Sequence, residues 1–281
     1  MGKKAVILGT FDGVHEGHRA VIKEASGYES TALSFRIPPK AYFDERVKLI
    51  MTADDRCRAL KKCGVNQTVL LDFSSVKNTE PWDFLENIRE KYSPQLICCG
   101  YDYKFGKNAG GNIETLKLYC EKKGILLRVA GCVSKNGNPV SSTFIRNAIA
   151  CGKTEIANSM LFEKFGFCET VISGDKRGRT IGFPTINQPY PDGLVLPPFG
   201  VYKTEVTIDK KTYKGVTDLG VRPTYKTDRV YCETYIDGYC GNAYGKQADL
   251  RLCSFIRPER RFESVEQLKA AIENDAKAAF E

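Results

Sequence analysis

The amino-terminal half of the chain alternates short apolar runs with stretches of helical periodicity. Short apolar runs that are rich in aliphatic and β-branched residues are typical of strands buried in a sheet. The stretches between them, such as 53–62, are long enough to form crossover helices. This alternation predicts an α/β fold with a doubly wound parallel sheet. The expected strands are 5–8, 31–35, 69–73, 96–99 and 126–129.

From Phe167 onward the chain changes to short β-rich runs separated by Gly and Pro, which predicts a small antiparallel β-barrel. The expected strands are 169–173, 201–208, 212–217, 230–236 and 249–255. Residues 264–267, Ser-Val-Glu-Gln, form a possible capping box for a closing helix. The apolar face expected for this helix contains Val265, Leu268, Ile272, Ala276 and Ala279. We predict two domains, 1–158 and 159–281, with a linker between 151 and 164.

Composition narrows the class of protein. A chain of 281 residues with 42% hydrophobic content has room for two modest globular domains. Its net charge of +8 is spread without a polybasic block, which favours anionic substrates and leaves nucleic acid a minor alternative. Eleven cysteines without a Cys-x-x-Cys pair indicate a reducing compartment. We see no signal peptide and no long apolar run, so we expect a cytoplasmic protein with no membrane, nucleic-acid or obligate protein partner.

The two histidines of the chain, His15 and His18, directly follow the loop 9–14. The loop is expected between a strand and a helix, where backbone N–H groups and the helix dipole attract phosphate. Residues three apart share a helix face, so both imidazoles can donate hydrogen bonds as charge builds on a phosphate. The alternatives are ordinary surface histidines or a zinc site. Zinc is disfavoured because neither His-Glu-x-x-His nor paired Cys-x-x-Cys spacing is found.

Two further segments favour a nucleotide site in the same half. The segment 100–106 contains Asp102, which can accept hydrogen bonds from ribose or adenine donors. The segment 141–146 places hydroxyl groups at an expected helix start, with Arg146 one turn inside. By itself this second pattern fits simple helix capping equally well. Together with the two histidines it favours phosphate contact.

A second chemical cluster occupies 174–187. It has neither Walker A spacing nor the loops of protein kinases. Its glycines permit backbone donation to phosphate, and Thr185 and Asn187 offer neutral oxygens for magnesium. An ordinary glycine-rich hairpin is the alternative. Further on, the alternation along 230–236 places Glu233 on one strand face with Tyr231 and Tyr235, where a carboxylate is usually just solvated.

The segment 9–18 resembles the His-x-Gly-His signature of nucleotidyltransferases, and Phe-Asp-Gly-Val-His within it resembles the bacterial FAD synthetase branch. The segments 100–106 and 141–146 are similar to that family's Gly-x-Asp-Phe-x-Phe-Gly and Ser-Ser-Thr-x-x-Arg motifs. The segment 34–39, Ser-Phe-Arg-Ile-Pro-Pro, lacks the histidine of the family's usual Thr-Phe-x-Pro-His-Pro. The resemblance implies that His15, His18 and Arg146 are catalytic. It implies ATP contacts by Gly9, Phe11, Asp12, Gly17, Asp102, Ser142 and Thr143.

The segment 178–187 resembles the riboflavin-kinase motif Gly-Arg-x-x-Gly-Phe-Pro-Thr-x-Asn, and similar segments follow at 197–202, 220–224 and 255–262. This resemblance implies that Glu233 is the general base and that Thr185 and Asn187 hold magnesium. It implies kinase ATP contacts by Gly174, Lys176, Gly178, Gly182, Thr185 and Asn187. It implies flavin contacts by Arg222, Thr224 and Arg257.

Together these motifs cover essentially the whole chain and resemble the bacterial bifunctional riboflavin kinase / FAD synthetase (FMN adenylyltransferase) family. The resemblance implies a nucleotidyltransferase-type sheet followed by a riboflavin-kinase barrel. It also implies two reactions with Mg²⁺ and ATP, riboflavin to FMN and then FMN to FAD with release of pyrophosphate. The alternatives are a monofunctional riboflavin kinase with an inactive adenylyltransferase domain, or a flavin- and nucleotide-binding regulatory module without catalysis.

Overall fold

The computed structural model divides the chain into two compact units. It describes residues 2–174, 178, 181–221 and 229–280. The first unit contains 1–145 and 160–163, and the second contains 146–159 and 164–281. Helix α7 (Ser142–Ala150) crosses this division. The domain boundary at 158/159 stays a prediction, while the contacts assign 146–159 to the second unit.

The first unit is built on a five-stranded parallel sheet in the order β3-β2-β1-β4-β5, as the alternation of runs predicted. Its strands are β1 (Lys4–Leu8), β2 (Glu29–Phe35), β3 (Gln67–Leu71), β4 (Leu96–Gly100) and β5 (Leu126–Ala130). The strand expected at 69–73 ends earlier because Asp72 caps the short helix α4 (Phe73–Val76), with its carboxylate accepting from the Ser74 amide. A small hairpin, β6 (Ser134–Lys135) and β7 (Asn138–Pro139), precedes α7.

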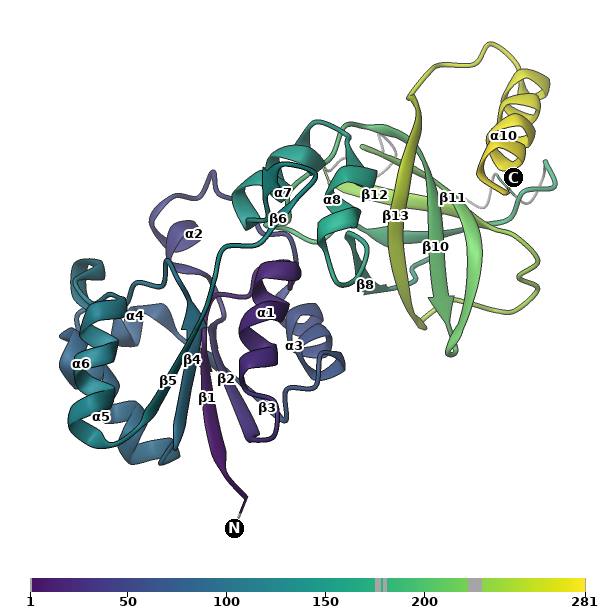
Figure 1. The fold of residues 1–281 in the computed structure, drawn as a ribbon. Helices are drawn as coiled ribbons and strands as arrows, with labels where there is room; N and C mark the ends of the chain where they lie inside the picture. Colours follow the sequence, from purple (N-terminus) through teal and green to yellow (C-terminus); the bar gives the residue numbers. More distant parts are fainter. Residues whose placement is uncertain (1, 175–177, 179–180, 222–228, 281) are drawn as a thin grey trace. The chain divides into compact units, whose positions relative to one another are not determined.

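Helices cover both faces of this sheet (Figure 1). They are α1 (Glu16–Glu24), α2 (Pro39–Phe43), α3 (Ala53–Lys62), α5 (Pro81–Tyr92) and α6 (Ile113–Lys123), with a 3₁₀ turn at Lys107–Ala109. Buried side chains of α5 and α6, such as Leu85 and Tyr119, pack on the face that carries Val6 and Ile97. Helices α1 and α3 lie on the other side (Figure 1). The sheet is therefore doubly wound.

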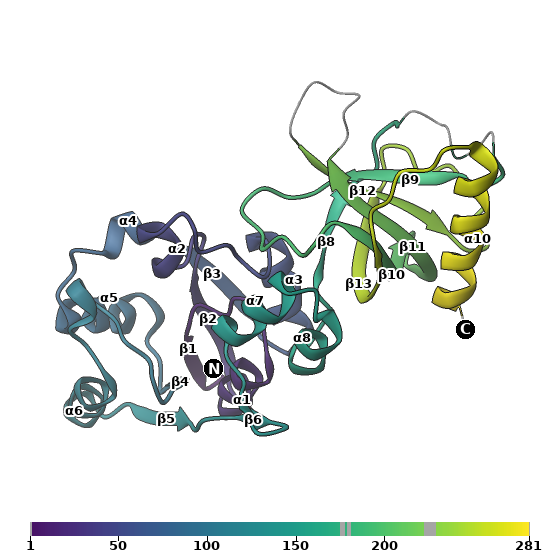
Figure 2. The ribbon, with the colours of Figure 1, turned by 90° about the horizontal axis from the view of Figure 1, so that it is seen from above.

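The second unit is a six-stranded antiparallel sheet in the order β8-β13-β10-β11-β12-β9. Its strands are β8 (Gly166–Thr170), β9 (Thr185–Pro189), β10 (Gly200–Ile208), β11 (Lys211–Val221), β12 (Val230–Ile236) and β13 (Gln247–Pro258). The backbone N–H of Ile172 donates to the Asn187 carbonyl at 2.8 Å, which joins the two ends of this order. The sheet therefore curves into the small barrel predicted from sequence (Figure 2).

Two strand predictions in this unit need correction. Strand β9 was not expected, because its segment was interpreted as part of a glycine-rich loop. It pairs with β12, and its Gln188 turns inward, where its amide donates to the carbonyls of Glu169 and Ala248. The strand expected at 169–173 lies three residues earlier, as β8.

Helix α10 (Val265–Phe280) lies along the barrel (Figure 2). The hydroxyl of Ser264 accepts from the Gln267 amide at 3.2 Å, as the predicted capping box requires. The return bond comes from the Glu263 amide, one residue before the cap. The buried face differs from the prediction: it contains Ala271, Asp275, Ala276 and Ala279, whereas Val265 is 57% exposed.

Helix α8 (Thr154–Met160) packs against β13 within the second unit. The amide of Asn158 donates to the Leu252 carbonyl at 2.8 Å, and its oxygen accepts from the Phe165 amide at 2.7 Å. Thr154 donates to the Cys253 carbonyl at 3.2 Å. In the part of the chain that the structure describes, no helix combines the length and the apolar character needed to cross a membrane.

Candidate active sites

The two histidines of the first unit form a reciprocal pair of hydrogen bonds at the start of α1. His15 is the N-cap, and its Nδ1 accepts from the His18 amide at 3.3 Å. The Nδ1 of His18 accepts in turn from the His15 amide, also at 3.3 Å. The rings stack with centroids 3.6 Å apart and an interplanar angle of 15°. An accepting Nδ1 carries no proton, so each neutral imidazole carries its proton on Nε2.

The surroundings of His18 favour its neutral form. Burial lowers the pKa of His18 well below its ordinary value, and the electrostatic interactions of His18 with His15 and Arg56 lower this pKa further. The edge of the Phe11 ring lies against His18, with centroids 5.3 Å apart. A neutral imidazole with its proton on Nε2 can still donate a hydrogen bond, and the amino-terminal end of α1 adds a partial positive charge. The arrangement therefore suits an anionic ligand.

The glycines of this loop make room for aromatic rings. Phe11 is fully buried with a φ of 53°, and a Cβ on Gly9 would lie 2.7 Å from its ring. A Cβ on Gly17 would lie 3.2 Å from the His15 ring. Gly9 is therefore needed for the shape of the loop, and Gly17 in α1 leaves little space beside the His15 ring. Their contacts with ATP stay predictions.

Asp12 connects the loop to two other segments. Its buried carboxylate accepts from the amides of Ile50 and Met51 at 2.9 and 3.2 Å. Its carbonyl accepts from the Ser142 hydroxyl at 2.9 Å. These contacts position the loop against the start of α7, and an ATP contact by Asp12 stays a prediction. Thr143 is exposed in the first turn of α7.

Helix α7 spreads the predicted Ser-Ser-Thr-x-x-Arg motif over both units. Ser142 and Thr143 belong to the first unit, and Arg146 belongs to the second. The catalytic role of Arg146 stays a prediction.

Arg56 on α3 was missed by the sequence analysis. It is fully buried, and its guanidinium donates to the carbonyls of Thr10, Phe35 and Arg36 at 3.3, 2.5 and 3.2 Å. These carbonyls lie at the carboxyl ends of β1 and β2, beside the histidine loop. The signal was a charged residue on the helix face that also carries Ala59 and Leu60.

The carboxyl edge of the same sheet carries two more predicted segments. Asp102 is exposed just after β4, which pairs with β1, and it lines a shallow depression with Lys104 and the first turn of α6. At the end of β2, the segment without the family's histidine leads into α2, where Phe43 is 73% exposed. The ring of Phe43 lies edge-on to Tyr42, with centroids 5.4 Å apart. An exposed aromatic pair, Tyr42 and Phe43, therefore follows the segment that lacks the histidine.

In the second unit the structure brings three predicted residues together. Asn187 on β9 is directly opposite Glu233 on β12, and Thr185 is opposite Tyr235. The Thr185 hydroxyl donates to Oε1 of Glu233 at 2.6 Å. Asn187 is 4% exposed, and its Oδ1 has no hydrogen-bond partner among the described residues. The side chains of Thr185, Asn187 and Glu233 therefore share one face of the barrel wall.

The glycine-rich segment before β9 is only partly described. Lys176, like Arg222 and Thr224 of the predicted flavin site, lies outside the described residues. The Gly178 carbonyl accepts from the Phe183 amide at 2.8 Å, and Gly182 has a φ of +87°. The first contact brings Gly178 and Phe183 together just ahead of Thr185. Phosphate contacts by Gly174, Gly178 and Gly182 stay predictions.

Arg257 on β13, the third predicted flavin contact, is bound to α10. Its Nε and Nη2 donate to the carboxylate of Asp275 at 2.9 and 2.7 Å, and its Nη1 donates to the Pro258 carbonyl at 3.1 Å. The flavin contact of Arg257 stays a prediction. Sequence reasoning missed Asp275 because an acidic residue on a terminal helix gives no sign of a buried partner 18 residues earlier.

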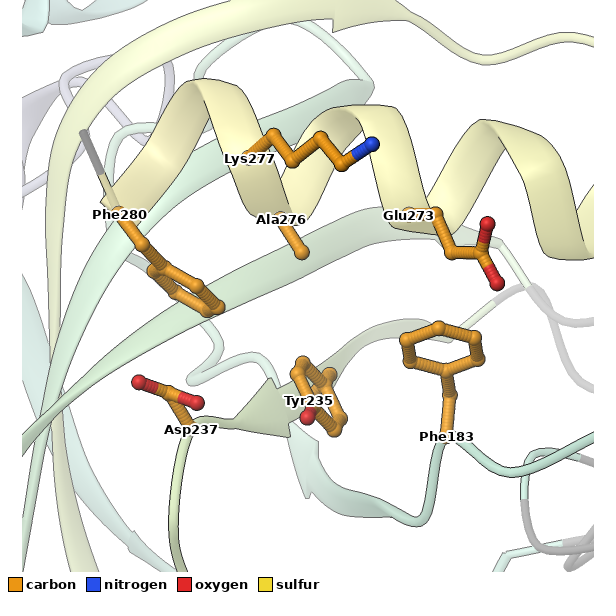
Figure 3. Close-up of a pocket in the computed structure, with 7 residues that line it drawn as sticks. All are labelled: Phe183, Tyr235, Asp237, Glu273, Ala276, Lys277 and Phe280. Atoms are coloured by element: carbon orange, nitrogen blue, oxygen red, sulfur yellow. The ribbon is translucent and has the colours of Figure 1, made fainter.

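A pocket of about 490 Å³ lies between α10 and the end of β12 (Figure 3). Three aromatic rings, one alanine and three charged side chains line it: Phe183, Tyr235, Phe280, Ala276, Asp237, Glu273 and Lys277. The rings of Phe183 and Tyr235 meet edge to face, with centroids 5.2 Å apart. Because Tyr235 is opposite Thr185, the pocket adjoins the Thr185–Glu233 pair.

Comparison with known proteins matches both units. Residues 1–144 match the FAD synthetase family and residues 161–281 match the riboflavin kinase family. The bifunctional riboflavin kinase/FMN adenylyltransferase of Listeria monocytogenes is 32% identical over 97% of this chain and 90% of its own. The protein of that name from Bacillus subtilis is 29% identical over 99% of this chain and 92% of its own. A crystal structure named as a macrolide-efflux protein from Streptococcus pneumoniae has a TM-score of 0.87 and 28% identity, covering 99% of this chain and 94% of that one.

The parallel sheet with its histidine turn and the barrel with its Thr185–Glu233 pair define a two-domain enzyme of flavin nucleotide synthesis. The chain belongs to the bifunctional riboflavin kinase/FMN adenylyltransferase family.

Proposed function

We propose that this protein phosphorylates riboflavin to FMN in its second unit and adenylylates FMN to FAD in its first unit, using ATP twice. The observation that carries the proposal is that each unit assembles its own polar cluster from neighbouring segments. These clusters are the His15–His18 pair in one unit and the Thr185–Glu233 pair in the other. A regulatory module without catalysis would need neither a reciprocal histidine pair nor a carboxylate beside a hydroxyl.

In the kinase reaction, Glu233 takes the proton of the riboflavin 5′-hydroxyl. The oxygen then bonds to the γ-phosphorus of ATP, the bond from that phosphorus to the bridging oxygen breaks, and ADP leaves. General-base catalysis of this kind is worth typically ~10²–10⁴-fold in rate. The bond from Thr185 holds the carboxylate in a fixed orientation.

The oxygens of Thr185 and Asn187 fit a magnesium ion. Asn187 Oδ1 is buried with no partner among the described residues. The Thr185 hydroxyl donates a hydrogen bond to Glu233, so the lone pairs of the Thr185 oxygen are left for another contact. Neutral oxygens are ligands that magnesium accepts beside phosphates and water. When bound, the ion would neutralise charge on the ATP phosphates.

The pocket under α10 suits the riboflavin ring system. Isoalloxazine is flat and largely apolar, and three aromatic side chains line the pocket: Phe183, Tyr235 and Phe280 (Figure 3). Its charged rim residues suit the polar edge of the flavin. A flavin in this pocket would lie next to Glu233, as phosphorylation of its side chain requires.

In the adenylyltransferase reaction, an oxygen of the FMN phosphate attacks the α-phosphorus of ATP and pyrophosphate leaves. The Nε2–H groups of His15 and His18 donate to the α-phosphate oxygens as negative charge builds on them. Ser142 and Thr143 at the start of α7, with Arg146 one turn further along the same helix, hold the triphosphate. The exposed aromatic pair Tyr42 and Phe43 at the same sheet edge offers a surface for the flavin ring of FMN.

One experiment separates the possible activities. The purified protein is incubated with riboflavin, ATP and Mg²⁺, and the flavins are separated by chromatography. We expect FMN followed by FAD. Formation of FMN alone would indicate a monofunctional kinase, and recovery of unchanged riboflavin would overturn the proposal in favour of a binding module.

A further inference from the structure

Helix α10 forms one wall of the pocket between α10 and β12. Glu273, Ala276, Lys277 and Phe280 line the pocket from the helix, and Phe183 and Tyr235 line it from the opposite side (Figure 3). The distance between the helix and β12 therefore sets the width of the pocket. A ring system held between these walls needs α10 in one fixed position.

The buried apolar side chains of α10 are all small. These side chains are Ala271, Ala276 and Ala279. Ala276 and Ala279 form a cluster with Val201 and Val216, and the half-buried Ile256 of β13 and Phe280 of α10 pack against it. Alanine methyl groups bury little apolar surface compared with leucine or phenylalanine. No large aliphatic side chain of α10 is fully buried in the described part of the helix.

An ion pair between a buried aspartate and a half-buried arginine lies in the middle of this face. Asp275 is 6% exposed, and Arg257 on β13 binds its carboxylate through two nitrogens, with the shortest distance 2.7 Å. Planar pairing through two parallel bonds fixes orientation as well as distance. Breaking such a pair leaves a buried charge without its partner, which strongly disfavours the packed state. At the end of the helix, the Lys214 ammonium donates to the Phe280 carbonyl at 2.6 Å.

We propose that the Arg257–Asp275 ion pair is the latch that holds α10 against the barrel and thereby sets the affinity for riboflavin. This inference rests on the proposed placement of riboflavin in the pocket. Arg257 and Asp275 act here as positioning residues. If the latch is broken, the packed position is only fractionally occupied, and the apparent dissociation constant rises by the inverse of that fraction.

The test compares Asp275→Asn with the matched control Asp209→Asn in the full-length protein. Asp209 belongs to the same unit and pairs with Lys246 at 2.6 Å, but this pair is exposed. We expect the KM for riboflavin to rise about tenfold in Asp275→Asn if the packed position falls to about a tenth of molecules, with kcat changed by less than about twofold. We expect Asp209→Asn to leave both the KM for riboflavin and kcat unchanged. Arg257→Lys, which keeps the charge but loses the paired bonds, should give a smaller rise.

Hydrogen exchange tests the latch without using activity. We expect faster amide exchange along 265–280 in Asp275→Asn, unchanged exchange in β10 and β11, and slower exchange along α10 when riboflavin saturates the variant. Unchanged riboflavin KM, or exchange that rises equally in every strand while kcat falls, would overturn the latch. If the unaltered protein makes no FMN and riboflavin protects nothing, the proposed function fails. Faster exchange confined to α10 of Asp275→Asn would still support the latch as a structural device.

Discussion

The Thr185 hydroxyl donates a hydrogen bond to Oε1 of Glu233, with the two oxygens 2.6 Å apart. The bond joins β9 to β12, the two strands whose register also sets Asn187 opposite Glu233. Because the hydroxyl proton points at the carboxylate, the oxygen of Thr185 keeps its lone pairs for a cation. One hydrogen bond thus makes the base role of Glu233 compatible with the ligand role of Thr185.

Glu233→Gln keeps the size of this side chain but cannot take a proton. We expect the rate of riboflavin phosphorylation to fall by roughly 10²-fold or more, with little change in riboflavin affinity. Formation of FAD from added FMN should continue, which provides the control within the same molecule. A retained phosphorylation rate with weakened riboflavin binding would show that Glu233 is a binding group.

Thr185→Val removes the hydroxyl while keeping the branched shape, and Thr185→Ser keeps the hydroxyl. We expect Val to raise the Mg²⁺ concentration needed for half-maximal kinase rate by roughly 10–100-fold, the range seen when support for a metal is removed. Thr185→Ser should need about the same Mg²⁺ concentration as the unaltered protein. Titration of the kinase rate with Mg²⁺ measures both, and equal Mg²⁺ requirements for Val and Ser would rule out a metal role for the hydroxyl.

Segments with a clear local pattern were predicted well. The helix expected at 53–62 matches α3 because its apolar positions repeat at helical spacing and the Thr52 hydroxyl caps it, accepting from the Asp55 amide at 3.1 Å. Strand β9 gave no such pattern, since its inward residue Gln188 is polar and is satisfied by carbonyls of distant strands. Its role became visible only through pairing with β12.

In the candidate sites, too, local contacts were predicted and contacts between distant segments were not. The His15–His18 pair is local, so a spacing of three predicted the shared face correctly. Partners that are distant in sequence were not predicted, because nothing near Arg257 points to Asp275 and nothing near Arg56 points to the carbonyl of Phe35. Such contacts depend on how the elements pack.

His18 should stay neutral at pH values where an ordinary histidine takes up a proton. Burial first, and then electrostatic interactions with His15 and Arg56, lower the pKa of His18 below its ordinary value. The chain has only two histidines, so NMR of the imidazole Cε1–H groups gives two signals and a His18→Gln variant assigns them. We expect the His18 signal to stay constant through about pH 6.5. A midpoint at or above that pH would contradict the neutral assignment.

The same shift predicts how stability depends on pH. Below about pH 6.5 the unfolded chain protonates His18 while the folded protein does not, so His18 lowers the free energy of unfolding as the pH falls. Above that pH the contribution of His18 to stability is fully present. Urea unfolding at several pH values should show that the free energy of unfolding falls less at acid pH in His18→Gln than in the unaltered protein.

His18→Ala should abolish FAD formation and leave FMN formation nearly intact. The imidazole lies in the first unit, whereas the Thr185–Glu233 pair lies in the second. The assay follows both flavins from riboflavin, ATP and Mg²⁺, and Glu121→Ala, which alters an exposed residue of the same unit, serves as the control. Equal loss of both products in a folded His18→Ala protein would contradict the separation of the two sites.

The last prediction concerns which fragment folds as an independent kinase. A fragment of 161–281 lacks α8, whereas 146–281 keeps it. Asn158 of α8 binds the Leu252 carbonyl and the Phe165 amide, and Ala157 is fully buried. We therefore expect both fragments to phosphorylate riboflavin, but the longer one to have a free energy of unfolding higher by about 1–3 kcal/mol.

Urea unfolding of the two fragments measures this difference, and Asn158→Ala in the longer fragment should reproduce part of it. Equal stability of both fragments would show that α8 does not stabilise the second unit. A folded 146–281 fragment without kinase activity would show that phosphorylation depends on residues of the first unit. Because the hydrogen bonds of Asn158 end on β13 and on the residue just before β8, activity should follow the folded fraction of each fragment.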